Sequence, residues 1–162
     1  MPARSKRPRA YLSGGMEYSR REGADWRLMM EQWLRKSLSH SVFNPNTASA
    51  SFLRKRGYRK VSFRALKRRN LLEYMRIVSA IVDRDSREII KNTSYVICKW
   101  DRSAERGAGT KGEVTLAKLV RKPVYVVTGI RPENIPGWVL GCTTRMFRSF
   151  AELKEFLKEK FN

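Results

Sequence analysis

The segment Gly107–Glu113, with the sequence GAGTKGE, holds the residues of this chain that are best suited to chemistry. Its first six residues match G-x-G-x-x-G, a pattern whose glycines let a backbone approach a dinucleotide pyrophosphate. Its last four, Thr110 to Glu113, match a helix capping box, in which the two side chains bind each other's backbone amides. A third interpretation makes Glu113 a catalytic carboxylate presented at the start of a helix.

The dinucleotide interpretation fails on position. It requires the glycines to follow a strand directly, but nine residues separate Trp100, the end of an apolar run, from Thr110. The capping box accounts for Thr110 and Glu113 but not for the glycines, which favour a tight turn with room beside the helix start. Cap and active site therefore remain alternatives for Glu113.

Asp85 is a second carboxylate with a suggestive position. A helical stripe predicts one apolar face, on which Asp85 falls, whereas Asp83 lies on another face. A carboxylate on the buried side of a helix needs a partner or a purpose, because desolvating a charge is costly. The residues of the predicted stripe are Met75, Val78, Val82, Asp85 and Ile89.

Alternating strands and helices must position these residues. Between the runs 94–100 and 123–128, which are typical of strands, lies a loop at 101–109 and a helix from about 111 to 121, which is a βαβ unit. The fold class we predict is α/β: a three-layer sandwich around a doubly wound, mostly parallel sheet of about five strands, Rossmann- or flavodoxin-like. The other predicted strands are 10–13, 40–44 and 144–147; the other helices are 22–38, one that starts at 70, and a last one capped by Ser149 and Glu152.

The carboxyl edge of this sheet is the expected ligand site. In open α/β sheets ligands bind outside the carboxyl ends of the strands. The first strand ends in Gly14-Gly15, and the strand 94–100 ends just before the glycine-rich segment. Both ends open onto the same edge, which places the candidate residues together.

The positive charge is concentrated in two segments. The chain of 162 residues carries a formal net charge of +20, and no acidic residue lies between Gln32 and Leu72, where eleven residues are Lys or Arg. Such density favours polyanionic partners, either nucleotide phosphates or nucleic acid. We expect a basic tail at 1–9 and one domain at 10–162 with a basic insertion at about 46–69, a long excursion with room for one short helix.

The most basic part, Arg54–Arg69, contains nine positive charges interleaved with Tyr58 and Phe63. Three interpretations stay open for it. It clamps a 5'-phosphate, it contacts nucleic acid through phosphates with aromatic stacking, or it is a mobile surface loop.

Composition excludes several classes. With 41% hydrophobic residues the chain is not disordered, and its short apolar runs indicate neither a membrane span nor a secretion signal. Cys98, Cys142 and the single His40 match no metal spacing, so we expect no metal and no cofactor. Buried free thiols in a reducing cytoplasm are the simplest interpretation of the cysteines.

Five motifs in order resemble the nucleoside 2-deoxyribosyltransferase family, which includes the 2'-deoxynucleoside 5'-phosphate N-hydrolases. The resemblance spans Tyr11 to Leu157. The motifs are YLSGGM (11–16), VFNP (42–45), VDRDSREIIKNTSYVI (82–97), GAGTKGEVTLAKLVRKPVYVV (107–127) and FRSFAELKEFL (147–157).

The resemblance implies roles for particular residues. Glu113 resembles the nucleophile that attacks the anomeric carbon of deoxyribose, and Asp85 resembles the acidic residue that assists at the sugar or base. Gly109 resembles a glycine whose amide faces a nucleotide phosphate. The implied substrate-binding residues are Tyr11, Ser13, Gly14, Gly15, Met16, Gly107, Gly109 and Thr110.

Two functional hypotheses follow. The first is an enzyme that cleaves the N-glycosidic bond of a 2'-deoxynucleoside or its 5'-monophosphate through a glycosyl-Glu113 intermediate and transfers the sugar to a base or to water. The second is a non-catalytic nucleic-acid-binding protein on the same fold, which uses the basic tail and the segment 54–69. The resemblance also implies a homodimer or larger oligomer.

Overall fold

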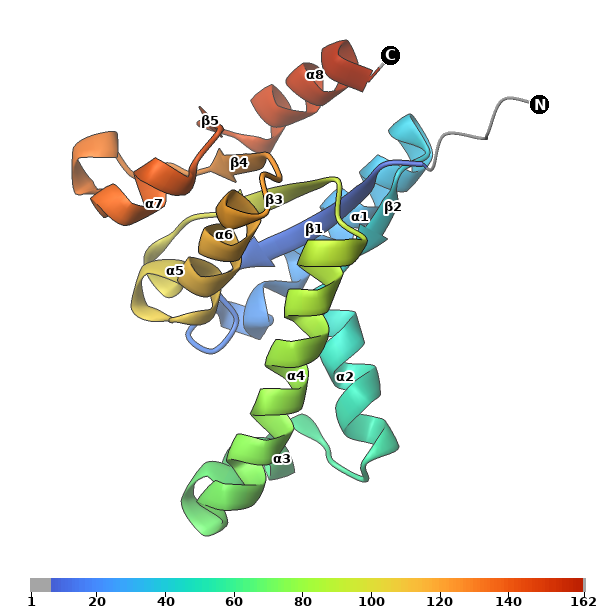
Figure 1. Cartoon of the computed structure of the whole chain (residues 1–162), viewed down its shortest axis with the longest axis vertical. Helices are drawn as coiled ribbons and strands as arrows, with labels where there is room; N and C mark the ends of the chain where they lie inside the picture. The colour runs from blue at the N-terminus through green and yellow to red at the C-terminus, as the bar shows by residue number, and fades with distance from the viewer. Residues whose placement is uncertain (1–6, 162) are drawn as a thin grey trace.

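Five parallel strands form one sheet in the order β2-β1-β3-β4-β5 (Figure 1). The computed structural model describes residues 7–161. This strand order is the flavodoxin-like one of doubly wound folds, so the predicted fold class is confirmed. The strands are β1 (Arg9–Gly14), β2 (Ser41–Phe43), β3 (Tyr95–Lys99), β4 (Val124–Val127) and β5 (Arg145–Phe147).

Helices connect all of these strands. Because every paired strand is parallel, each connection must cross from one end of the sheet to the other. The helices are α1 (Ala24–Leu38), α2 (Pro45–Lys55), α3 (Lys60–Arg69), α4 (Leu71–Lys91), α5 (Arg102–Arg106), α6 (Gly109–Leu119), α7 (Gly137–Cys142) and α8 (Phe150–Phe161). Two short 3-10 turns, Arg20–Gly23 and Pro132–Asn134, complete them.

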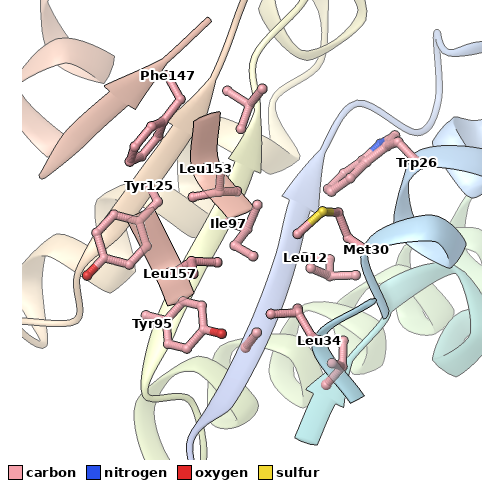
Figure 2. Packing of buried hydrophobic residues seen from close by; sticks show 13 residues of the cluster. Leu12, Trp26, Met30, Leu34, Tyr95, Ile97, Tyr125, Phe147, Leu153 and Leu157 are labelled. Carbon is pink, nitrogen blue, oxygen red and sulfur yellow. The ribbon is translucent and has the colours of Figure 1, made fainter. Parts of the chain in front are cut away.

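Two apolar clusters lie on opposite faces of the sheet. On one face α1 and α8 cover the strands: Met30 and Leu34 of α1 lie beside Leu12, and Leu153 and Leu157 of α8 lie beside Ile97 (Figure 2). On the other face α4, α6 and α7 supply residues such as Ile89, Val114 and Val139. The three layers follow from this division.

The alternation of β1 decides which side chains face α6. Successive side chains of a strand point to opposite faces, so Tyr11 and Ser13 share one face and Leu12 takes the other. Tyr11 belongs to the cluster of α4, α6 and α7, whereas Leu12 belongs to that of α1 and α8. The sequence of β1 therefore directs two hydroxyl groups toward α6.

The region 45–69 is not an excursion with one short helix, as predicted, but two helices, α2 and α3, which we call the arm (Figure 1). Pro45 is the first residue of α2, where its missing N–H costs nothing. Asn44 caps this helix by accepting from the amide of Asn46 at 3.1 Å. The arm packs against α4, whose predicted start is confirmed by the bond from the Glu73 amide to Asn70 Oδ1.

Three further expectations are corrected. The predicted loop 101–109 contains α5, because Asp101 caps it by accepting from the amides of Ser103 and Ala104. The predicted stripe of α4 is wrong at Met75 and Val82, which are exposed, while Ile77 is buried. The predicted tail 1–9 already enters β1 at Arg9, and residues 1–6 lie outside the described residues.

The cysteines are free and buried, as expected. Within residues 7–161 no helix has both the length and the apolar character that crossing a membrane demands.

Candidate active site

The carboxylate of Glu113 binds two hydroxyl groups of β1. Tyr11 Oη donates to Glu113 Oε1 at 2.7 Å, and Ser13 Oγ donates to Glu113 Oε2 in a short hydrogen bond. All three residues were predicted site residues, and the structure brings them together. Both carboxylate oxygens are therefore oriented by side chains that lie about a hundred positions earlier in the chain.

The capping-box interpretation of Glu113 is wrong. Helix α6 begins at Gly109, two residues earlier than expected, with Ala108 as its N-cap and no side-chain capping bond. Thr110 is consequently inside the first turn and buried, so it cannot serve as the cap. Glu113 does not cap the helix, and its side chain faces β1 instead.

Burial changes the ionisation of Glu113. Part of the residue is exposed, but its carboxyl group is desolvated by the surrounding protein, which raises its pKa from 4.5 to about 7. The hydrogen bonds from Ser13 and Tyr11 oppose this rise by stabilising the charged form, and Asp85 adds to it by repulsion. Glu113 is therefore poised between acid and carboxylate near neutral pH.

Asp85 is the second acidic group of the cluster. Desolvation raises its pKa, while Arg84, whose Nε lies 2.8 Å from Asp85 Oδ1, lowers it. The Tyr11 hydroxyl, whose one proton is donated to Glu113, lies close enough to lower the pKa of Asp85 as well. Asp83, by contrast, is exposed on α4, as its place in the helical pattern predicted.

Arg84 was missed by the sequence analysis. Its guanidinium donates to Ser49 Oγ of α2 at 2.9 Å and lies over the rings of Phe43 and Phe52. It thereby links Asp85 to the arm. Nothing in its neighbourhood in the sequence marks it, since many residues of this chain are basic.

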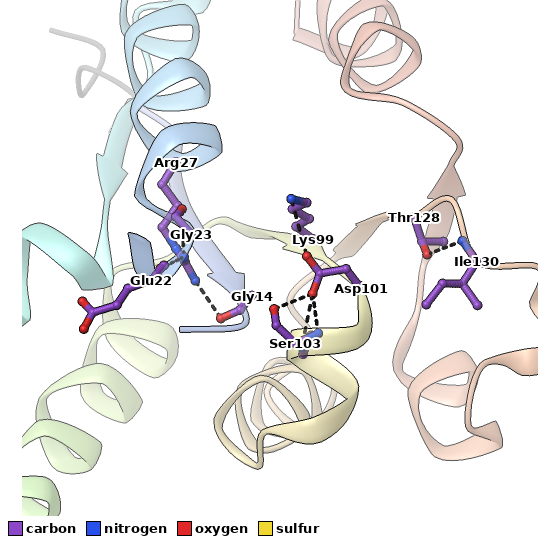
Figure 3. A network of polar contacts seen from close by, with 10 residues as sticks. Gly14, Glu22, Gly23, Arg27, Lys99, Asp101, Ser103, Thr128 and Ile130 are labelled. Atoms are coloured by element: carbon purple, nitrogen blue, oxygen red, sulfur yellow. Dashed lines mark hydrogen bonds and ion pairs between the residues drawn. The ribbon is translucent and has the colours of Figure 1, made fainter. Parts of the chain in front are cut away.

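Arg27 was also missed, and it organises the end of β1 (Figure 3). This buried side chain donates to the carbonyl oxygens of Leu12 at 3.1 Å, Gly14 at 2.7 Å and Gly23 at 3.2 Å. It thus fixes the turn that follows the two hydroxyl-bearing residues. Its spacing from Met30 and Leu34 on the inward face of α1 is the signal that could have revealed it.

The glycines after β1 are required by packing. A Cβ on Gly15 would lie 2.0 Å from Ser103 Oγ and 2.7 Å from the Ala104 nitrogen, and one on Gly14 would lie 3.0 Å from the Trp26 ring. Neither residue therefore needs a ligand to explain it. Their close approach lets the capped start of α5 lie against the end of β1 (Figure 3).

The glycines before Glu113 behave differently. Gly107 lies beside Ser103 and Tyr18 in ordinary contact, whereas a Cβ on Gly109 or Gly112 would meet nothing within 4 Å. The first amides of α6 have no partner within the helix. Open space therefore adjoins a helix start that carries free N–H donors.

A cavity of about 480 Å³ lies between the arm, α4 and the turn after β1. Of the predicted site residues Met16 and Asp85 line it, whereas Tyr11, Ser13 and Glu113 do not, so Asp85 marks where the cavity meets the cluster of carboxylates. The other lining residues, none of them predicted as site residues, are Glu17, Tyr18, Glu22, Asn46, Ser49, Ala50, Leu53, Lys60, Phe63, Arg64, Lys67, Tyr74, Val78 and Ile81.

Asn46, which lines this cavity, has an unsatisfied oxygen. Its Nδ2 donates to the carbonyl of Glu22 at 3.0 Å, but its buried Oδ1 has no hydrogen-bond partner among the described residues. Buried polar atoms are usually satisfied, so this oxygen is an exception. Within residues 7–161 no group of three or more His, Cys, Asp or Glu could hold a metal ion.

Comparison with known proteins supports the fold. No protein-family model and no curated protein sequence matches the chain. A 2-deoxyribosyltransferase from the psychrotolerant bacterium Bacillus psychrosaccharolyticus has a similar structure, with a TM-score of 0.55 and 16% sequence identity over 90% of each chain. At this identity the likeness shows a shared fold.

Proposed function

We propose that the chain cleaves the N-glycosidic bond of a 2'-deoxynucleoside or its 5'-monophosphate, with Glu113 as nucleophile. One observation carries the proposal: Tyr11 and Ser13 bind both oxygens of a buried carboxylate at the carboxyl edge of the sheet. A glutamate with a purely structural role at the start of a helix would instead bind a backbone amide of that helix. The fold shared with a 2-deoxyribosyltransferase supports the same reaction class.

The reaction divides into two steps. In the first, an oxygen of Glu113 bonds to C1' while the bond from C1' to the base nitrogen breaks and its electron pair stays with the base. Asp85, whose pKa is raised by burial, supplies the proton that the departing base takes up. In the second, the oxygen of water or the nitrogen of another base attacks C1', the bond from C1' to Glu113 breaks and releases the carboxylate, and the proton of the attacking group passes to Asp85.

The cavity suits such a substrate. About 480 Å³ lies within the range of pockets that hold small ligands, and Phe63 and Tyr74 stack in its wall with their ring centroids 5.1 Å apart. For a 5'-monophosphate, the open helix start at Gly109 supplies N–H donors and a favourable dipole.

Incubation with deoxynucleosides and their 5'-monophosphates, followed by chromatography of the free base, tests this function. Addition of a second free base separates the two fates of the sugar, because a transferase forms a new nucleoside and a hydrolase forms only deoxyribose or its phosphate. Release of no base from any deoxynucleoside or deoxynucleotide would contradict the proposal.

We also propose that the chain self-associates through the outer face of α4. Leu72, Met75 and Val82 are between 55 and 71% exposed on this helix, although each is a large apolar side chain. Light scattering is expected to give at least a dimer, and Leu72→Glu with Met75→Glu is expected to give a monomer. A wild-type monomer at high concentration would contradict this.

A further inference from the structure

Of the nine cations of Arg54–Arg69, three lie on the inner side of the arm and five on its outer side, while Arg56 lies over the ring of Phe52. Helical geometry places residues 60, 64 and 67 on one side of α3 and residues 61, 65, 68 and 69 away from it. The first group lines the cavity, and the second does not. The two sides of one helix therefore have different electrostatic roles.

The three inner cations are paired with two carboxylates within the chain. Lys60 Nζ lies 2.7 Å from Glu22 Oε2, and Arg64 Nη2 lies 2.6 Å from Glu22 Oε1. Lys67 Nζ lies 3.2 Å from Glu17 Oε1. These pairs hold α3 over the cavity, and they leave the inner side with little charge for a phosphate.

The outer cations have no such counter-charge. Arg54, Lys55, Arg59, Arg68 and Arg69 are all exposed, and within residues 7–161 none of them has a carboxylate oxygen within 4.0 Å. Exposed positive charges without internal counter-charges favour the binding of an external polyanion.

The surface beside α3 is also hollowed. Arg68 and Arg69, together with Ala65 and with Arg64, which is paired with Glu22, line a shallow depression of about 540 Å³. Guanidinium groups bind phosphates through paired N–H donors, so arginines around a hollow are suited to phosphodiesters. The outer group contains four arginines and one lysine, which fits this preference.

The other side chains of α3 favour a nucleic acid over a lipid surface as the binding partner. A helix that binds membranes inserts a broad apolar face, but the outer side of α3 offers only Val61 and Ala65. Of the two aromatic residues that the sequence suggested for stacking, Tyr58 and Phe63, Phe63 instead stacks on Tyr74 toward the cavity. The cations therefore outnumber the aromatic side chains available on the outer side, which favours contact through phosphates rather than bases.

We propose that the outer face of the arm, formed by Arg54, Lys55, Arg59, Arg68 and Arg69, binds the phosphate backbone of a nucleic acid without base specificity. The binding is independent of Glu113, so it does not rest on the function proposed above. It is expected for single and double strands alike, because phosphates are common to both.

Fluorescence anisotropy with labelled DNA and RNA oligonucleotides, single- and double-stranded, tests the site. Contact of four of these five cations with phosphates predicts an affinity that falls by about 100-fold between 50 and 200 mM salt. The variant Arg54→Gln/Lys55→Gln/Arg68→Gln/Arg69→Gln should lower the slope of log affinity against log salt by about 3. Glu113→Gln should bind as the wild type does.

The matched control removes the same charge elsewhere. Its substitutions are Lys91→Gln, Lys118→Gln, Arg131→Gln and Arg148→Gln, all at exposed positions outside the arm. Circular dichroism confirms that both variants are folded. An equal loss of binding in the control would overturn the proposal, as would wild-type protein that binds phosphatidylserine vesicles but no nucleic acid at 50 mM salt.

Discussion

The hydroxyl of Tyr11 donates a 2.7 Å hydrogen bond to the carboxylate of Glu113, 102 positions later in the chain. The bond joins β1 to α6 on one face of the sheet. It also sets the chemistry of Glu113, because it stabilises the charged form of a carboxyl whose pKa burial has raised to about 7. The ionisation of Glu113 should therefore be visible in the activity.

Activity should rise with pH as Glu113 ionises. A nucleophilic carboxylate must be deprotonated, so we expect kcat/KM for base release to increase through a midpoint near the pKa of about 7. Tyr11→Phe removes a hydrogen bond that lowers this pKa, and it should move the midpoint upward by roughly one pH unit. A pH profile of base release measures both.

Tyr125→Phe is the control for this profile. Tyr125 is a buried tyrosine of the same sheet, but it lies in the cluster of α1 and α8, away from Glu113. The control should keep the wild-type midpoint. A Tyr11→Phe midpoint equal to that of wild type would show that the hydroxyl does not act on Glu113.

Glu113→Gln should stabilise the protein at alkaline pH. The folded-state pKa of about 7 lies above the ordinary 4.5, so the folded protein binds more protons between these values and its free energy of unfolding falls as the pH rises through them. At pH 8 the variant should be more stable by on the order of 2 kcal/mol, and at pH 4.5 nearly equal to wild type. Thermal melts at both pH values check this.

The exposed Glu159 provides the comparison, and Glu159→Gln should leave both melts unchanged within about 0.5 kcal/mol. A Glu113→Gln protein less stable than wild type at pH 8 would mean that the carboxylate stabilises the fold, contrary to its position as a functional group.

The effect of replacing a glycine by alanine should depend on the position of the glycine in the fold. Gly15→Ala forces a Cβ into Ser103 and Ala104, so it should destabilise the protein by at least about 2 kcal/mol. Gly112→Ala meets open space inside a helix and should be neutral or stabilising by about 0.5 kcal/mol.

Gly109→Ala should also fold normally but raise the KM for substrate about tenfold, roughly 1.4 kcal/mol of binding. Chemical denaturation and kinetics distinguish the three, and an unchanged KM in Gly109→Ala would argue against a ligand at the start of α6.

Glu22→Gln should loosen the arm. The substitution keeps the size of the side chain but removes the charge that binds Lys60 and Arg64. Both cations are largely exposed, so global stability should change by less than about 1 kcal/mol. Hydrogen exchange of α3 should nevertheless accelerate by about fivefold, since local opening needs no global unfolding. Glu155→Gln, which breaks the pair with Lys158 on α8, should leave exchange in α3 unchanged.

Much of the fold was predictable because its signals are local. The strand Tyr95–Lys99 is a continuous apolar run, and α8 shows Leu153 and Leu157 at helical spacing, so each element could be read from its own residues. The positions of the glycines after two strands then indicated the carboxyl edge of the sheet. The resemblance of the motifs singled out Glu113 and Asp85.

The errors came from contacts that no local pattern encodes. The arm reads as a polar excursion because α3 has no buried residue; its ion pairs to Glu17 and Glu22 lie about 40 to 50 positions away in sequence. The capping box at Thr110 was plausible in isolation, and only the earlier start of α6 and the hydroxyls of β1 exclude it. Arg84 and Arg27 act through carbonyl, hydroxyl and carboxylate groups brought close by folding.

The most direct test of the central claim is intact-protein mass spectrometry after brief mixing with a deoxynucleoside or deoxynucleotide that the protein cleaves. We predict that the wild type gains the mass of one deoxyribosyl group, or of its 5'-phosphate form, and that peptide mapping places it on Glu113. Glu113→Gln should gain none and lose at least about a thousandfold in base release. Full activity in Glu113→Gln, or an adduct on another residue, would contradict the account.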